Sequence, residues 1–175
     1  MPRSQPESND ALIAVGLPTP FGLFIAHYSA RGLAQLHFPR RYAKPPQVDV
    51  ASLPPKLREW IALTTQATQA VLTGTAPGPL PPLDLSAGTD FQQRVWSALR
   101  RIPLSGSRSY AEIAREIGSP KAARAVGGAC GANPIPVLIP CHRVLAAGRD
   151  LGGFTAGLDW KLRLLAAEGV ETGSS

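Results

Sequence analysis

The residues best suited to covalent chemistry in this chain are the adjacent Cys141 and His142, followed by Arg143. The thiolate form of cysteine is a nucleophile, and a nearby imidazole or guanidinium favours that form. The apolar run 135–139 contains proline and is closed by Pro140, a pattern that predicts buried extended chain. We therefore expect Cys141 to be held rigidly at the floor of a pocket. A cysteine after an apolar run is also often a buried structural residue, so the Cys-His pair alone leaves both interpretations open.

Two short helices joined by a tight turn are predicted ahead of this stretch. Ser109 and Glu112 form a capping-box pattern around a helix over 110–117, which Gly118 ends. A second helix is expected over 120–130, with its proline at the first helical position. This helix-turn-helix pattern occurs in DNA-binding proteins and also in helical hairpins that never meet DNA. It is therefore compatible with DNA binding without establishing it.

The second of these helices combines one arginine with several glycines. Its inward face is predicted to carry Ala122, Ala125, Val126 and Ala129. Its outer face carries Arg124, Gly127, Gly128 and Gly131. Because a glycine inside a helix costs about 1 kcal/mol relative to alanine, their repetition indicates that a partner approaches the backbone closely. The face lacks the Asn, Gln and Arg array that reads base edges, so we expect contact that depends little on DNA sequence. The alternative is tight helix-on-helix packing through small residues.

The remaining elements must position these two stretches. Short runs over 12–17, 23–28 and 33–38 predict an antiparallel meander, which we interpret as structural support. After a Pro-rich connection over 40–55, the expected elements are a helix over 56–73, a Gly- and Pro-rich linker over 75–82 and a short strand over 83–85. Thr89 and Gln92 suggest a capping box for a helix whose inward stripe is Phe91, Val95, Trp96 and Leu99. The last helix is expected over 158–168, with Leu158, Leu162 and Leu165 facing inward.

Composition restricts the class of protein. The chain has 175 residues, enough for one domain or two small ones, and its net charge of +6 favours a polyanionic partner. Its two cysteines, Cys130 and Cys141, are too few for a disulfide framework or a structural zinc site with the histidines present. No apolar stretch is long enough to span a bilayer, and the first ten residues lack a signal-like core. We expect a soluble protein of a reducing compartment that binds no metal and no membrane.

Three motifs together resemble the active-site signature of the O6-alkylguanine-DNA alkyltransferases. They are Pro140-Cys141-His142-Arg143, the preceding Asn133-Pro134 and the following Gly152-Gly153-Phe154. The resemblance runs from about residue 88 to residue 169 and is weaker in the N-terminal third. It implies an α/β (α+β) fold, with a small antiparallel sheet and helix, ribonuclease H-like, over 11–74. A mostly helical, winged-helix-like domain over 88–170 would carry the helix-turn-helix, bind DNA and accept the alkyl group. The expected flanking segments are a disordered tail over 1–10, a linker over 75–87 and a second tail over 171–175.

The resemblance assigns roles at the reacting centre. Cys141 would be the nucleophile and alkyl acceptor, His142 its base through a water molecule, and Glu168 the carboxylate that orients the imidazole. Asn133 would form the hinge between the second helix and the site. Tyr110 would contact a phosphate and donate the proton that the leaving guanine needs.

The resemblance also implies contacts with DNA. Arg124 would fill the gap left when the target nucleotide is rotated out, with its helix lying in the minor groove. The other residues expected to contact the substrate or the DNA are Ala123, Gly127, Gly128, Arg143, Val144, Phe154 and Thr155. Many relatives carry Tyr and Ser where this chain has Phe154 and Thr155. The ring surface and one hydroxyl are therefore kept, while one hydroxyl donor is lost.

The function implied by the resemblance is direct-reversal DNA repair. The family flips O6-alkylguanine, above all O6-methylguanine, out of the duplex and transfers the alkyl group irreversibly to its cysteine. For this chain that means a cysteine S-methyltransferase that reacts once per molecule at Cys141 and uses no cofactor. Double-stranded DNA is the expected partner, bound with little sequence preference by a monomer in the cytoplasm, or at the nucleoid in a bacterium.

Three competing functions fit the residues less well. A non-enzymatic damage-binding module of the same fold would lack the nucleophile that Cys141 provides. A Cys-His-Glu hydrolase of peptides would carry a small-residue turn before the cysteine, where this chain has an apolar run. A DNA-binding regulator would need no buried thiol and would prefer one DNA sequence.

Overall fold

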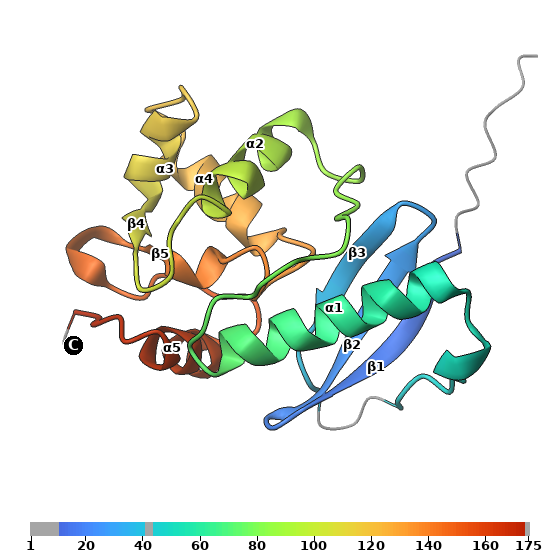
Figure 1. The fold of residues 1–175 in the computed structure, drawn as a ribbon. Helices are drawn as coiled ribbons and strands as arrows, with labels where there is room; N and C mark the ends of the chain where they lie inside the picture. Colours follow the sequence, from blue (N-terminus) through green and yellow to red (C-terminus); the bar gives the residue numbers. More distant parts are fainter. Residues whose placement is uncertain (1–10, 41–43, 174–175) are drawn as a thin grey trace, which may run out of the picture.

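The chain forms an α+β fold in which a small antiparallel sheet and a long helix pack against a group of shorter helices (Figure 1). The computed structural model describes residues 11–40 and 44–173. The tail predicted over 1–10 and the end of the tail predicted over 171–175 lie outside the described residues. Within the described part of the chain, no helix is both long and apolar enough to cross a membrane.

The N-terminal sheet is the predicted meander. Its strands are β1 over Ile13–Thr19, β2 over Gly22–Ser29 and β3 over Gly32–His37. They pair antiparallel in the order β1-β2-β3, because two-residue turns bring each strand directly back beside the last. Leu83 forms one isolated parallel bridge with Leu33, where a short strand was predicted over 83–85.

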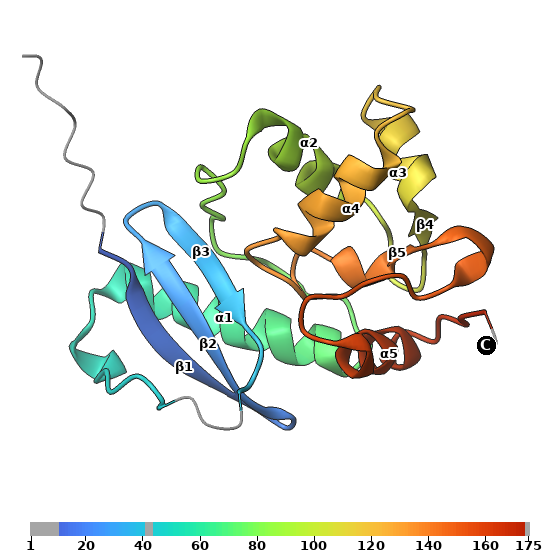
Figure 2. The ribbon, with the colours of Figure 1, turned by 180° about the vertical axis from the view of Figure 1, so that it is seen from behind.

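The long helix α1, over Pro55–Leu72, follows a short 3-10 turn, η1, over Val50–Ser52 and lies along the sheet (Figures 1 and 2). Its buried stripe includes the predicted Leu57, Trp60, Ile61, Thr64, Ala67 and Val71. Gly74 ends the helix with φ +80°, and a Cβ there would lie 1.9 Å from the carbonyl oxygen of Ala167. Only glycine therefore allows the end of α1 to meet the C-terminal helix so closely.

The C-terminal helices are α2 over Asp90–Leu99, α3 over Tyr110–Glu116, α4 over Ala123–Gly131 and α5 over Leu158–Ala167. Both predicted capping boxes form, one at the start of α2 and one at the start of α3. The indole N–H of Trp96 donates to the carbonyl of Ala129 at 2.8 Å and joins α2 to α4. One continuous hydrophobic core connects these helices to the sheet and α1.

The second helix of the helix-turn-helix differs from its prediction. The helix α4 begins at Ala123, because Pro120 belongs to a turn that the N–H of Ala122 closes by donating to the carbonyl of Ser119 at 2.9 Å. Val126 and Ala129 are buried, but Ala125, predicted to face inward, is exposed.

The inward face of α5 also differs from its prediction. Leu158 and Leu162, expected inside, are 45% and 42% exposed. The buried face instead carries Lys161, Leu164, Leu165 and, just past the helix end, Glu168. Leucines lie on both sides of this helix, so the spacing of apolar residues alone did not determine which side faces the core.

The apolar run before Cys141 is buried, as predicted, but it is not extended. It folds into a turn in which the N–H of Ile139 donates to the carbonyl of Ile135 at 2.9 Å. Val137 has φ +75°, a left-handed conformation that costs a β-branched residue about 1–2 kcal/mol. The chain then forms a short 3-10 helix, η2, over Cys141–Arg143. The strand β5, over Val144–Leu145, pairs in parallel with β4, over Arg108–Ser109, and a third 3-10 element, η3, follows over Ala147–Arg149.

Candidate active site

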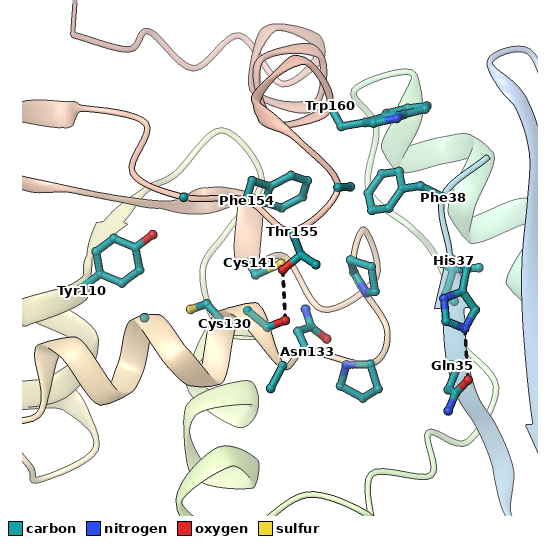
Figure 3. Close-up of a pocket in the computed structure, with 18 of the residues that line it drawn as sticks. Gln35, His37, Phe38, Tyr110, Cys130, Asn133, Cys141, Phe154, Thr155 and Trp160 are labelled. Atoms are coloured by element: carbon teal, nitrogen blue, oxygen red, sulfur yellow. Dashed lines mark hydrogen bonds between the residues drawn. The ribbon is translucent and has the colours of Figure 1, made fainter. Parts of the chain in front are cut away.

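A cavity of about 1290 Å³ lies between the C-terminal helices and the end of β3, with Cys141 in its wall (Figure 3). From the C-terminal half, its lining includes Tyr110, Ala123, Arg124, Gly127, Cys130, Asn133, Phe154 and Thr155. From the N-terminal half, it includes Gln35, His37, Phe38, Pro39 and Arg40. The sheet predicted as structural support therefore also supplies one wall of the cavity.

Cys141 is held at the start of η2 and is 6% exposed. Burial raises the pKa of its thiol, while a hydrogen bond from Asn133 and the positive charge of Lys161 act to lower it. The net shift is upward, so the resting residue is a thiol rather than the thiolate that the neighbouring basic residues suggest. Reaction at this sulfur therefore requires a group that accepts its proton.

Asn133 fixes the turn that carries the cysteine. Its Nδ2 donates to the carbonyl of Ile139 at 2.8 Å, and its Oδ1 accepts from the N–H of Ile135 at 2.9 Å. The same side chain thus holds both ends of the turn between α4 and Cys141. This geometry fits the hinge role predicted for Asn133.

His142 is fully buried and pairs with Glu168, as predicted, at 2.9 Å between Nε2 and Oε1. Burial lowers the pKa of His142 more than the carboxylate raises it, so the imidazole is neutral at neutral pH. Because an ionised carboxylate only accepts hydrogen bonds, Nε2 must carry the imidazole proton. The other nitrogen, Nδ1, is buried without a hydrogen-bond partner among the described residues and keeps a free lone pair. The imidazole is therefore held by Glu168 with one nitrogen able to accept a proton.

Arg143 has a different place from the one predicted. Its guanidinium is buried and donates to both carboxylate oxygens of Glu168, at 2.9 and 2.8 Å, and to the carbonyl of Ile102 at 2.7 Å. These bonds are all internal to the protein, and a contact of Arg143 with DNA or substrate stays a prediction. Hydrogen bonds from His142 and Arg143 outweigh the effect of burial and lower the pKa of Glu168 to about 2.

The contact predicted between Val144 and the substrate stays a prediction. It is fully buried, and its backbone N–H donates to the carbonyl of Cys141. The residue also pairs with Arg108 in the β4-β5 ribbon. Its backbone donor is therefore not free to bind a base edge.

Tyr110 enters the cavity from the start of α3. A Cβ at Gly152, which has φ +65°, would lie 2.9 Å from the Tyr110 hydroxyl oxygen, so only glycine lets the loop pass this ring. Burial and the nearby thiols raise the pKa of Tyr110. The hydroxyl therefore stays protonated at neutral pH and is able to act as the predicted donor.

The helix α4 forms one edge of the cavity. Ala123, Arg124 and Gly127 line it, and Arg124 is exposed, as a residue that enters DNA must be. A Cβ at Gly127 would lie 3.8 Å from the ring of Tyr110, whereas nothing lies within 4 Å of one at Gly128. Gly128 lies outside the cavity on the open side of the helix, and its contact with DNA stays a prediction.

The glycine-rich loop forms the opposite edge. The ring of Phe154 packs edge-on against Phe38 with centroids 5.9 Å apart, and Phe38 packs against Trp160 at 4.9 Å. The hydroxyl of Thr155 donates to the carbonyl of Gly131 at 3.1 Å, which ties the loop to the last turn of α4 (Figure 3). This hydrogen bond must break before the Thr155 hydroxyl donates to a base.

Sequence reasoning missed three contributors to the site. Lys161 is buried under the glycine-rich loop, and Phe38 and Trp160 form the aromatic wall. The spacing of Lys161, Leu164, Leu165 and Glu168 is a helical stripe and was the available signal. This spacing was not used in the prediction because a lysine normally lies on the exposed side of a helix.

The described residues contain no group of three His, Cys, Asp or Glu side chains placed to hold a metal ion. The rings of His27 and His37 approach each other edge-on, with centroids 5.1 Å apart. Burial lowers the pKa of both, so neither carries a charge at neutral pH.

The chain matches the family model described as 6-O-methylguanine DNA methyltransferase, DNA binding domain, over residues 90–170. The methylated-DNA–protein-cysteine methyltransferase of Mycolicibacterium paratuberculosis is 57% identical over 86 residues, which are 49% of this chain and 52% of that protein. The protein of the same name from Methanosarcina acetivorans is 54% identical over 82 residues, 47% of this chain and 53% of that one. The chain thus spans about half the length of the curated relatives it matches.

Solved structures extend the likeness to nearly the whole chain. The crystal structure of Mycobacterium tuberculosis OGT in complex with DNA is 36% identical with a TM-score of 0.72, over 89% of this chain and 91% of that one. The M. tuberculosis O6-methylguanine methyltransferase is 37% identical with a TM-score of 0.69, over 90% and 92% of the two chains. The N-terminal sheet therefore belongs to the shared fold, although the matched family model begins after it.

Proposed function

The chain belongs to the 6-O-methylguanine DNA methyltransferase family, and on that premise we propose that it repairs alkylated DNA by moving the alkyl group of O6-alkylguanine to Cys141. The observation that carries the proposal is the placement of Cys141 in the wall of the cavity, followed in the chain by His142, whose neutral imidazole is oriented by a buried carboxylate. A base of this kind removes the thiol proton that burial otherwise retains. The best substrate is O6-methylguanine in duplex DNA.

The transfer is a displacement at carbon. The thiol proton passes to Nδ1 of His142 through a bridging water, and the resulting sulfur anion attacks the methyl carbon. The new S–C bond forms as the bond from that carbon to guanine O6 breaks. Tyr110 donates a hydrogen bond and then a proton to the leaving guanine, and is reprotonated through solvent. Overall, the alkyl group moves to sulfur and the thiol proton replaces it on guanine, so charge is conserved.

The target base must leave the duplex to reach the cavity. Rotating a nucleotide out costs a few kcal/mol, least where pairing is already damaged. The exposed Arg124 at the rim is placed to fill the gap, with the glycine-bearing face of α4 against the minor groove. This helix carries no array of base-reading side chains, which supports binding with little sequence preference.

The product is a thioether, which no group near Cys141 is suited to cleave. Cys130 lines the same cavity, but burial raises its pKa to about 12, and a thiol does not displace an alkyl thioether. Each molecule therefore reacts once. We further propose that it acts as a monomer and without a cofactor. We propose that it acts on DNA in the cytoplasm, and at the nucleoid if the cell is bacterial.

The finer architecture is part of the same proposal. The three-stranded sheet with α1 supports a ribonuclease H-like N-terminal domain over 11–74. The β4-β5 ribbon beside α3 and α4 supports a winged-helix-like domain over 88–170, with a linker over 75–87.

The test uses a duplex with one O6-methylguanine that carries a labelled methyl group. We expect one label per protein molecule, recovered on the peptide that contains Cys141. Cys141→Ser should bind the duplex and take up no label, and Cys130→Ser, the matched thiol control in the same cavity, should take up one. Label on Cys141→Ser, or more than one transfer per molecule, would show that the proposal is wrong.

A second measurement tests the role of Arg124. Arg124→Ala should weaken capture of the lesion in duplex DNA more than it slows reaction of Cys141 with a free alkylated base. Equal losses in both assays would remove the gap-filling role. Lys121→Ala, in the turn before α4, is the matched loss of a nearby positive charge.

A further inference from the structure

The segment that follows α5, residues 170–173, is docked onto the C-terminal half of the protein (Figure 2). Val170 is 9% exposed and packs with Leu145, Leu151 and Leu165 in a small hydrophobic cluster apart from the main core. Its N–H donates to the carbonyl of Leu165 at 2.9 Å. We call residues 170–173 the C-terminal strap, because the segment continues from this anchor across the turn η3.

The strap holds η3 through Arg149. The guanidinium donates twice to the backbone carbonyl of Glu171, once from Nε at 3.1 Å and once from Nη2. In the opposite direction, the N–H of Gly173 donates to the carbonyl of Arg149 at 3.0 Å. A Cβ at position 173 would lie 2.7 Å from the carbonyl oxygen of Gly148, so a side chain there is incompatible with the docked strap. The contact uses the backbone of Glu171 rather than its side chain.

The backbone of η3 has a conformation that needs such support. Arg149 has φ +64° and follows Gly148 at φ +70°. Residues other than glycine rarely adopt this left-handed conformation, and it persists where the surrounding structure imposes it. Arg149 is exposed and does not line the cavity. Contact with a bound base therefore does not account for its conformation, whereas the strap bonds both its side chain and its carbonyl.

The turn η3 leads directly into the glycine-rich loop that forms one edge of the cavity. Leu151 packs with Val170 of the strap. The next residue, Gly152, passes so close to Tyr110 that a Cβ there would lie 2.9 Å from the hydroxyl oxygen. Residues 153–155 then line the cavity. A shift of η3 would therefore move the wall of the cavity and its contact with Tyr110.

The loop has little bonding of its own to resist such a shift. Within residues 152–157, the N–H of Gly157 donates to the carbonyl of Phe154 at 2.9 Å. The hydroxyl of Thr155 ties the far side of the loop to α4. A glycine-rich segment with sparse backbone bonding opens at low cost. The position of its first residues therefore depends on the segment that enters it, which is η3.

We propose that the C-terminal strap positions the glycine-rich loop as a wall of the base pocket, with Arg149 and Gly173 as the positioning residues. The inference rests on the proposed function in taking the cavity as the site of the flipped base. Once the strap is released, the wall is in place in only a fraction of the molecules. The apparent affinity for the lesion falls by that fraction. The transfer rate at saturation is kept, because a bound base selects the molecules whose wall is in place.

The test uses two substitutions that release the strap from opposite sides, Arg149→Ala and Gly173→Val, in a Cys130→Ser background. Alanine removes the donors to Glu171, and valine places a side chain against the carbonyl of Gly148. Single-turnover kinetics are measured on a duplex with one O6-methylguanine. In both variants the half-saturating protein concentration should rise roughly fivefold, while the limiting rate stays within twofold of native.

Two further variants separate the strap from a simple effect of charge. Arg149→Lys keeps the charge and a donor for the Glu171 carbonyl, so it should recover most of the native affinity. Arg58→Ala removes an exposed positive charge from α1 and should leave both constants unchanged. Gly173→Val changes no charge. If Arg149→Ala weakens binding and Gly173→Val does not, Arg149 acts through its charge and the strap is overturned.

Iodoacetamide reads the sulfur of Cys141 without a base pocket. Both strap variants should react with it at no less than the native rate. A slower reaction, or a limiting rate of transfer that falls as much as the affinity, would place the damage at the reacting centre and overturn the positioning role.

Hydrogen exchange tests the strap without DNA or any reaction. Amides over 151–157 should exchange roughly tenfold faster in Gly173→Val than in the native protein, and equal rates would overturn the proposal. A native protein that fails to demethylate DNA, but whose loop responds to Gly173→Val in this way, would count against the proposed function alone.

Discussion

Each half of the molecule holds a carboxylate whose pKa is lowered to about 2, partly buried at Asp84 and buried at Glu168, and the two serve different purposes. In the N-terminal half, Asp84 accepts hydrogen bonds from the hydroxyls of Ser29 and Ser86, each at 2.6 Å, and from Arg31 at 3.3 Å. Burial opposes its ionisation, and these bonds outweigh burial. They join the segment around Asp84 to the end of β2, so Asp84 is structural.

In the C-terminal half, Glu168 accepts from the imidazole of His142 and from both ends of the Arg143 fork. Its carboxylate is as well bonded as that of Asp84, but one partner has a second nitrogen that is free to take a proton. A lowered carboxylate pKa therefore identifies a well-bonded carboxylate in either half. What distinguishes the active site is the chemistry of the partner, because a serine hydroxyl ends the network and an imidazole continues it.

The largest expected effect is that of Glu168→Gln. An amide donates as well as accepts, so it permits the wrong imidazole tautomer and leaves Arg143 unpaired. Methyl transfer should slow by roughly 10²- to 10⁴-fold, judged by the effect of neutralising a triad carboxylate. The free energy of unfolding should fall by about 3–5 kcal/mol, as for a broken buried ion pair. Single-turnover kinetics and urea unfolding measure the two, with exposed Glu171→Gln as control. If Glu168→Gln transfers the methyl group at a rate within twofold of the native protein, Glu168 has only a structural role, like Asp84.

Glu168 should also contribute to the loss of stability in acid. The folded pKa of Glu168 lies at about 2, below its ordinary value of 4.5, so its stabilisation is complete above pH 4.5 and is lost as the pH falls towards 2. The shift corresponds to about 3 kcal/mol for this fully buried side chain. Urea midpoints measured from pH 6 to 2.5 should therefore fall less steeply in Glu168→Gln than in the native protein. An unchanged slope would mean that the carboxylate is not held ionised by its partners.

Asp84→Asn should separate stability from reaction. Loss of the charged acceptor leaves Ser29 and Ser86 with weaker bonds and should lower the free energy of unfolding by about 1–3 kcal/mol. The rate of methyl transfer at neutral pH should not change, because no partner of Asp84 reaches the cavity wall around Cys141. A tenfold slower transfer in a folded Asp84→Asn protein would contradict the separation of the two networks.

The smallest effect is expected for Phe38→Leu, which tests how far the N-terminal half takes part in the site. The leucine keeps an apolar contact but loses the packing of Phe38 against Phe154 and Trp160. Stability should fall by about 1 kcal/mol, and transfer should slow roughly threefold as the loop wall loosens. Phe21→Leu, in the β1-β2 turn, is the matched control. Equal rates for both variants would limit the N-terminal half to support.

Local patterns predicted most of the secondary structure. The three strands, the long helix and both capping boxes follow from turn residues, alternation and Ser/Thr caps that act within a few residues. The predicted start of α4 failed because contacts with neighbouring residues decide it. Pro120 suits a first helical turn, but the chain first closes a β-turn at Ala122, and α4 begins one residue later.

The reacting centre shows the same division. The motif around Cys141 and the pairing of His142 with Glu168 were predictable because the family signature contains them. The orientation of the Arg143 side chain was not predictable from the sequence. A cation beside a nucleophile is equally suited to bind a substrate and to pair with a buried acid. The guanidinium turned inward because Glu168 arrives there from α5, 25 residues further along the chain.

The sequence by itself determined which residues are proposed to do the chemistry, because the thiol, the imidazole and the carboxylate are identified by residue type and motif alone. Only the tertiary structure decided that the thiol rests protonated, that Lys161 points inward with three carbonyls around it, and that β3 closes the cavity. Ionisation depends on the solvent and charges that surround a group, and those come from segments distant in sequence. That environment exists only once the two halves have packed together.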